Sequence, residues 1–209
     1  MTLTPEAIRQ YDREAPDSER TETATFGLGC FWGPDARFGA MDGVVRTRVG
    51  YAGGTSPDPT YNSIGDHTEV FQVEYLPEKR SFGDLLELVF RAHDPFHQTG
   101  KRQYQHIVFT DTRSQRGSLD AYLRMRGFDR ADLETRVEAL STFSPAEHYH
   151  QKYSLRSKRW VTEAFEKAGY DDVDIRESPA AAKLNGSVAG NDLSEEHDLL
   201  TGGAPSPTE

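Results

Sequence analysis

The stretch ETATFGLGCFWGPDARFGAM (residues 22–41) predicts both how the fold begins and where its chemistry lies. Residues 22–28 are short, rich in threonine and apolar side chains, and typical of a strand. A turn with glycines on both sides of Cys30 follows, and residues 31–41 then predict a helix. Pro34 suits the first turn of that helix, where its missing N–H has no partner to lose. We therefore expect Cys30 at the end of a strand, on the first turn of a helix.

The rest of the chain predicts an α+β protein. Four further strands and two helices are expected. Apolar side chains recur at helical spacing in these helices, and Ser81 caps the first of them. The strands are at 44–51, 68–75, 104–110 and 135–139, and the helices at 82–90 and 114–125. A third helical stretch is expected from Pro145 through His150 toward residue 168. Together with the strand at 22–28 and the helix at 31–41, this order of elements predicts helices packed on one mixed or antiparallel sheet.

We expect three segments along the chain. Residues 1–21 form a polar lead-in that is helical around 5–11, and residues 22–170 form the catalytic domain. Residues 171–209 are acidic and poor in apolar side chains, and after Pro179 they show no periodicity. Such a composition buries too little apolar surface to repay the entropy of ordering, so the segment is expected to be a largely disordered tail.

Composition limits the partners that the chain can have. Its 209 residues carry a formal net charge of −10, which disfavours nucleic acid and anionic membrane surfaces. No apolar run is long enough to cross a bilayer, and residues 1–22 lack the apolar core of a secretion signal. A single cysteine without such a signal fits a reducing compartment. We therefore expect a cytoplasmic monomer.

Cys30 has two interpretations. A lone thiol forms no internal disulfide, so it is either a small buried residue or a nucleophile. Unpaired N–H groups and the positive dipole at a helix start favour the thiolate, which is the reactive form. Gly29 and Gly33 let the backbone turn sharply and leave the sulfur reachable, and Phe31 and Trp32 would form an apolar wall beside it. These features favour the nucleophile.

The chain resembles the A-type peptide methionine sulfoxide reductases, as a divergent single-cysteine member. The resemblance spans about residues 24–153 and rests on ordered segments of the sequence. These are GCFWG (29–33), VGYAGG (49–54), PTY (59–61), HTEV (67–70) with QV (72–73), HDP (93–95), QY (103–104), PAE (145–147) and YHQ (149–151). It implies a two-layer, ferredoxin-like α+β sandwich, which agrees with the element order above.

The resemblance also implies a role for each site residue, with no metal and no organic cofactor. Cys30 would attack the sulfur of methionine-(S)-sulfoxide, whose S-methyl group would rest on two aromatic rings. Glu69 would protonate the sulfoxide oxygen, and two tyrosine hydroxyls would donate hydrogen bonds to it. The product on Cys30 is a sulfenic acid. The rings belong to Phe31 and Trp32, and the hydroxyls to Tyr61 and Tyr104.

Three departures from the family pattern bear on this account. Only residues 62–66 separate Tyr61 from the HTEV segment, where the family commonly has a longer loop. Residues 96–102 replace a Gly-Asn-Asp stretch, so the acidic residue that supports the site has no counterpart, and Gln105 replaces the usual arginine. Residues 150–209 hold no resolving cysteine. We therefore expect an external reductant, either thioredoxin or a low-molecular-weight thiol.

Other interpretations remain open from the sequence. On spacing alone Glu69 would be an ordinary exposed strand carboxylate. Beside a thiolate in an apolar pocket, it would instead share one proton with Cys30. A metal site at the histidines is disfavoured because no ligand pattern joins them, and His150 is expected to line the cleft. The rivals are a cysteine hydrolase, and a relative that binds oxidised methionine without turnover.

Overall fold

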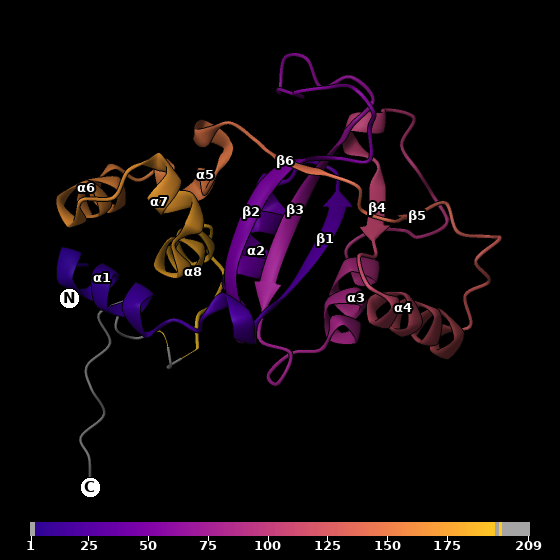
Figure 1. Cartoon of the computed structure of the whole chain (residues 1–209), viewed down its shortest axis with the longest axis horizontal. Coiled ribbons are helices and arrows are strands. Elements are labelled where there is room, and N and C mark those ends of the chain that lie inside the picture. The colour runs from indigo at the N-terminus through magenta and orange to yellow at the C-terminus, as the bar shows by residue number, and fades with distance from the viewer. Residues whose placement is uncertain (1–2, 195–196, 198–209) are drawn as a thin grey trace, which may run out of the picture.

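The computed structural model describes residues 3–194 and 197, and Figure 1 shows a sheet with helices packed against it. Six strands form this sheet in the order β5-β4-β1-β3-β2-β6. The β1–β3, β1–β4, β2–β3 and β2–β6 pairs are antiparallel, and the β4–β5 pair is parallel. The strands are β1 (Glu22–Leu28), β2 (Val44–Ala52), β3 (Thr68–Tyr75), β4 (His106–Phe109), β5 (Arg136–Glu138) and β6 (Phe143–Pro145).

The helices of the described residues fall into two groups (Figure 1). One group follows the strands of the central sheet: α2 (Trp32–Gly39), α3 (Phe82–Arg91) and α4 (Arg113–Arg126). The other lies beside β2 and joins the start of the chain to its later part. It consists of α1 (Pro5–Glu14), α5 (Tyr153–Arg156), α6 (Arg159–Ala168), α7 (Asp172–Glu177) and α8 (Pro179–Val188).

The predicted α+β class is confirmed. The central elements follow each other as β1-α2-β2-β3-α3-β4, and their strands lie in the order β4-β1-β3-β2, which is the ferredoxin-like arrangement. Two expected elements differ in detail. The strand expected at 104–110 begins at His106 because a 3-10 turn, η2 (Arg102–Tyr104), precedes it. The helix expected from Pro145 is divided into β6, a 3-10 turn η3 (His148–His150), α5 and α6.

Aromatic rings form the core between the sheet and α2. Phe26 of β1 and Phe71 of β3 face each other in register, with ring centroids 5.8 Å apart. Phe38 of α2 packs on Phe71 at 4.9 Å, and Phe82 at the start of α3 stacks on Phe26 at 5.8 Å. All four rings are buried, so they fix the position of α2 over the strands.

The prediction of a largely disordered segment from residue 171 is wrong for residues 172–188. Asp171 caps α7 in a capping box with Asp174, and α8 is buried along most of its length. Small residues allow α8 to approach α2 so closely that a Cβ on Gly39 or on Gly186 would lie 2.6 Å from backbone oxygens of the other helix. The rest of that prediction concerns residues that lie mostly outside the described part. The boundaries of the catalytic domain stay a prediction.

A buried polar cluster connects α2 to α5 and α8. Asp35 of α2 accepts hydrogen bonds from Thr47 and Asn185 and lies 3.6 Å from the Nζ of Lys152. Lys152 is fully buried and donates to the backbone oxygen of Thr47. Asn185 of α8 accepts a hydrogen bond from the N–H of Leu155 in α5. Because each of these charges has partners, the cluster holds three helices in one relative position.

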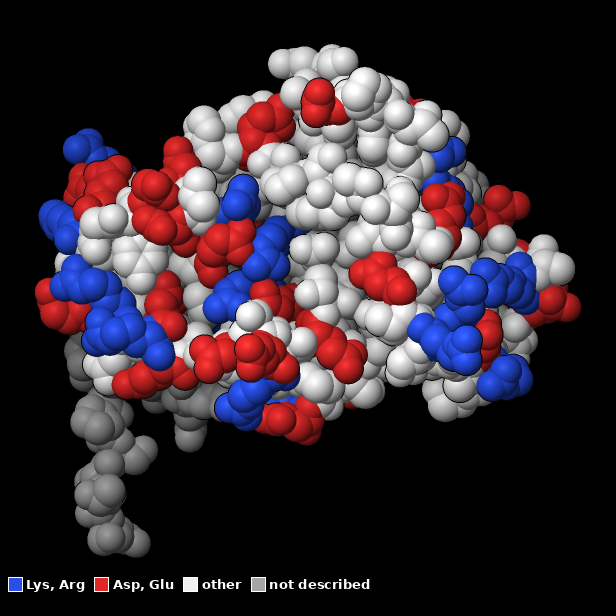
Figure 2. Space-filling model, in the orientation of Figure 1, with Lys and Arg blue, Asp and Glu red and all other residues white. Residues whose placement is uncertain are grey.

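The charged side chains are unevenly distributed over the face drawn in Figure 2. They gather toward α1, α6 and α7 at one end and toward α4 at the other, whereas the region around the 53–66 loop is largely uncharged. Among residues 3–194 and 197, we find no helix with the length and apolarity that a bilayer crossing requires.

Candidate active site

Cys30 lies between β1 and α2, with its side chain exposed. Gly29 before it has a φ of +76°, a left-handed conformation that favours glycine, and this turn carries the chain from the strand to the helix. The N-cap of α2 is Phe31, so Cys30 stands one residue before the cap and not on the first turn as expected. The N–H of Trp32 donates a hydrogen bond to the thiol.

The thiol is less acidic than the helix start alone would make it. Loss of solvent around the sulfur raises the pKa of Cys30, the Trp32 N–H lowers it, and the nearby Glu69 carboxylate raises it. The desolvation is the largest of these effects, so the net shift is upward. Neutralising Glu69 removes one of the two causes that oppose the thiolate.

Glu69 is buried near the start of β3, on the face of the sheet that packs against α2. Its Oε1 accepts a hydrogen bond of 2.7 Å from the Nε2 of Gln103, and its Oε2 accepts one of 3.3 Å from the N–H of Phe31. Burial raises the pKa of Glu69, although these donors and the charge of Lys101 act in the opposite direction. The interpretation as an exposed strand carboxylate is therefore wrong.

Tyr61 and Tyr104 meet above this carboxyl group. A side-chain hydrogen bond joins them, and partial burial, that bond and the charges of Glu69 and Cys30 raise the pKa of Tyr104 to about 12. The Tyr104 hydroxyl therefore stays protonated at neutral pH and can donate a hydrogen bond. The Lys101 ammonium lies 4.5 Å from the centroid of the Tyr104 ring.

Aromatic side chains surround His150. The ring centroid of His150 lies 5.3 Å from that of Phe31 and 4.9 Å from that of Tyr61, and its Nδ1 accepts a hydrogen bond from the Trp32 indole at 3.2 Å. Phe31 is buried, whereas Trp32 is half-buried and stacks on Tyr153 with centroids 3.7 Å apart. The expectation that His150 lies at the site agrees with these contacts.

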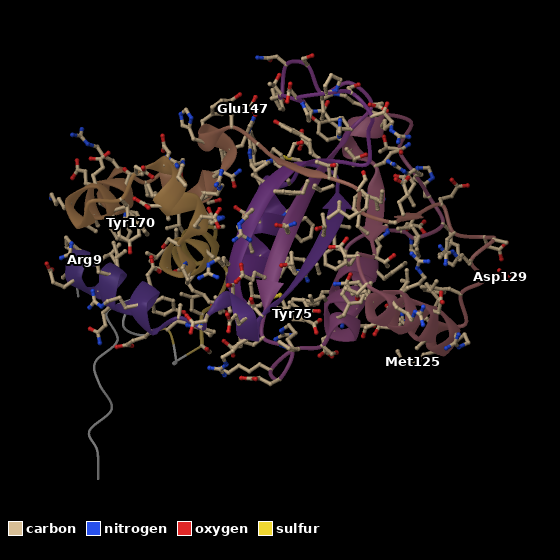
Figure 3. All side chains as sticks on the ribbon, viewed as in Figure 1. Arg9, Tyr75, Met125, Asp129, Glu147 and Tyr170 are labelled. Atoms are coloured by element: carbon tan, nitrogen blue, oxygen red, sulfur yellow. The ribbon has the colours of Figure 1, made fainter. Side chains whose placement is uncertain are left out.

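Three residues of the site had no role predicted from the sequence. They are Gln103, which holds Glu69; Tyr153, which stacks on Trp32; and Glu147. The Glu147 carboxylate accepts hydrogen bonds from the N–H of Tyr61 at 2.9 Å and from the hydroxyl of Tyr51 at 2.8 Å, and it lies above the upper end of the sheet (Figure 3). Gln103 and Glu147 lie in the segments that carry the family resemblance, and nothing else in the sequence indicated that they belong to the site.

The structure brings the six predicted site residues into one cluster at the end of β1 and β3. Of these, Phe31 donates to Glu69, and Tyr104 contacts Tyr61. Within residues 3–194 and 197, no three His, Cys, Asp or Glu side chains form a group that could hold a metal ion. His93 instead bonds the backbone oxygen of Val89 and the hydroxyl of Thr135.

Comparisons with known proteins agree with this geometry. The family model described as peptide methionine sulfoxide reductase matches residues 22–178. A peptide methionine sulfoxide reductase of Drosophila melanogaster is 40% identical over 171 residues, covering 80% of this chain and 68% of the relative. One from Haloquadratum walsbyi is 40% identical over 144 residues, covering 64% of this chain and 82% of the relative.

The solved structure of methionine sulfoxide reductase A of Corynebacterium diphtheriae is also similar. It superposes with a TM-score of 0.55 at 31% identity, over 66% of this chain and 76% of that one. The sequence match extends across the central sheet, α2 and all six predicted site residues. The chain belongs to the peptide methionine sulfoxide reductase family.

Proposed function

We propose that the chain reduces methionine-(S)-sulfoxide, free or in proteins, to methionine, and so repairs oxidative damage. One observation carries this proposal: an exposed thiol, Cys30, stands beside a buried carboxyl group, Glu69, whose pKa is raised. A nucleophile that must attack sulfur and an acid that must protonate oxygen are the two groups that this reduction needs.

Proton sharing between the two groups makes the reactive state available. Burial raises the pKa of both groups and two adjacent anions are disfavoured, so the pair holds one proton, which Glu69 carries whenever Cys30 is the thiolate. Burial and hydrogen bonding place the Glu69 carboxyl close to the backbone of Phe31, next in sequence to the nucleophile. The proton donor and the nucleophile therefore reach the same bound group.

The reaction then balances without a cofactor. The Cys30 sulfur attacks the sulfoxide sulfur while Glu69 protonates the oxygen, and Tyr61 and Tyr104 donate hydrogen bonds to that oxygen as its negative charge grows. Transfer of the hydroxyl to Cys30 leaves methionine and a sulfenic acid, so the substrate sulfur gains the two electrons that the Cys30 sulfur loses. The S-methyl group rests against the rings of Phe31 and Trp32.

Regeneration requires two electrons from an external thiol. A first thiol attacks the sulfenic acid and forms a mixed disulfide with Cys30, and its proton leaves with the hydroxyl group as water. A second thiolate then attacks this disulfide, which frees Cys30 and leaves the reductant as a disulfide. Cys30 is the one cysteine of the 209 residues, so neither thiol comes from this chain. Thioredoxin and low-molecular-weight thiols both fit, and we propose a cytoplasmic monomer that binds neither nucleic acid nor membrane.

Steady-state turnover of N-acetyl-methionine-(S)-sulfoxide with dithiothreitol tests the proposal. We expect Cys30→Ser to be inactive, because a hydroxyl is a far weaker nucleophile than a thiolate at neutral pH, and Glu69→Gln to be slower by roughly 10²–10⁴-fold. Turnover that survives Cys30→Ser contradicts the proposal. If the wild type binds the sulfoxide without any turnover, the chain is a binding module. If it hydrolyses a p-nitrophenyl ester and does not reduce the sulfoxide, it is a hydrolase.

A further inference from the structure

Gly33 is a position that the fold itself does not explain. Gly29 needs its left-handed φ, but Gly33 lies in α2 without a positive φ, and a Cβ added to it would meet nothing within 4 Å. A glycine in a helix loses more backbone entropy on folding than an alanine would. Because none of the described residues occupies the space above Gly33, the reason for a glycine here lies outside the packing of the fold.

Gly33 opens onto a groove of about 590 Å³ beside Trp32. One wall is α2 itself. The others are formed by Leu28 and Ala92, by Tyr153 and Ser154 of α5, and by Ala189 and Asn191 after α8. The groove and the site share Trp32, the residue proposed to hold the S-methyl group. A polypeptide whose oxidised methionine reaches Cys30 therefore has a continuous apolar surface beside it on which to lie.

Arg37 adds a charge to this groove, one helical turn beyond Gly33. Its side chain is exposed, and it makes no ion pair or hydrogen bond with any of the residues that the structure describes. Some exposed arginines do have such partners, as Arg20 has in Glu78 and Arg159 in Glu163. Among the described residues, Arg13, Arg113, Arg116 and Arg124 are also exposed without one, but Arg37 is the member of this group that lines the groove. An unpaired guanidinium in a largely apolar groove favours a carboxylate from outside the chain.

We propose that the groove binds the polypeptide that flanks an oxidised methionine, and that Arg37 selects substrates with an Asp or Glu nearby. Arg37 lies four helical residues from Gly33, a rise of about 6 Å at ~1.5 Å per residue. An extended chain advances ~3.3 Å per residue, so the acidic residue stands two or three positions from the methionine. Without a side chain at Gly33, the peptide backbone can lie directly on α2. This inference rests on the proposed function and adds a substrate class to it.

Matched peptides test the inference with dithiothreitol as reductant, so that docking of a protein reductant plays no part. Each peptide carries one methionine sulfoxide and an Asp two or three residues before or after it, and its control carries Asn in the same place. The quantity measured is the ratio of kcat/KM for the peptide to that for N-acetyl-methionine sulfoxide. Three variants accompany the wild type: Arg37→Gln, Gly33→Ala, and Arg159→Gln as a matched exposed arginine outside the groove.

We expect the wild type and Arg159→Gln to favour at least one Asp peptide over its Asn control by about threefold or more, and Arg37→Gln to lose that preference. Gly33→Ala should lower the ratio for every peptide, because its methyl group occupies the floor of the groove. Equal rates for Asp and Asn peptides, or a preference that survives in Arg37→Gln, overturn the inference. A wild type that reduces neither peptide nor N-acetyl-methionine sulfoxide refutes the proposed function instead, which keeps the two failures distinct.

Discussion

Replacing Gln103 with Met should extend activity to higher pH. The Gln103 amide donates to the Glu69 carboxylate at 2.7 Å and so favours the charged form, whereas proton donation requires the neutral form. A hydrogen bond to a charged group contributes about 1.5–3 kcal/mol, and one pKa unit corresponds to about 1.4 kcal/mol. The substitution therefore destabilises the charged carboxylate by an energy of this order and raises the pKa of Glu69, since the remaining Phe31 donor is longer at 3.3 Å.

Activity is lost as rising pH removes the proton that Glu69 and Cys30 share, because the carboxyl group then has none to give. A higher pKa of Glu69 holds this proton more tightly and moves the loss of activity to higher pH. The assay is kcat/KM for N-acetyl-methionine sulfoxide between pH 5 and 9. Gln105→Met is the control: Gln105 bonds Thr99 and Arg136 near the same turn but does not touch Glu69. If the loss of kcat/KM at high pH stays at the same pH in Gln103→Met, moves to lower pH, or moves equally in Gln105→Met, the proposed effect of Gln103 on Glu69 is wrong.

Three further predictions concern the substrate contact and the stability of the fold. Trp32→Ala should raise KM for N-acetyl-methionine sulfoxide up to roughly tenfold by removing a sulfur–aromatic contact, and an unchanged KM contradicts that role. Burial lowers the pKa of His93 to about 4, so unfolding takes up a proton below pH 6.5. Urea titrations should therefore show about 1 kcal/mol less stability at pH 5 than at pH 7, a figure that allows for the partial exposure of His93. His93→Gln should flatten this difference. Asp35→Ala leaves the fully buried Lys152 without its carboxylate and should cost about 3–5 kcal/mol by the same titration; a loss under 1 kcal/mol would show that the pair is not needed.

The sequence could predict the elements that carry a strong local pattern. The stripe of Phe82, Leu85, Leu86 and Val89 behind the Ser81 cap predicted α3, and the structure adds a capping box from Asp84. Cys30 and Glu69 are 39 positions apart, and only the resemblance to a family brought them together before β1 and β3 were seen to be neighbours.

Helix α8 could not be predicted, for a physical reason. Its residues PAAAKLNGSV are buried on nearly all sides, so no apolar face alternates with a polar one, and the small side chains that allow α2 to approach look like those of a linker. Buried charges are equally hidden: nothing local in Lys183 or Lys152 shows that each is buried with its ammonium donating to backbone oxygens. Such partners come from distant segments.

In the proposed reaction the Cys30 sulfur takes the oxygen from the substrate while Glu69 supplies the proton. A single turnover without reductant tests it most directly, with methionine quantified and the protein analysed by mass spectrometry after trapping with dimedone. We expect about one methionine released per chain and a dimedone adduct confined to Cys30. Methionine released without an adduct at Cys30, or an adduct formed without methionine, would contradict it.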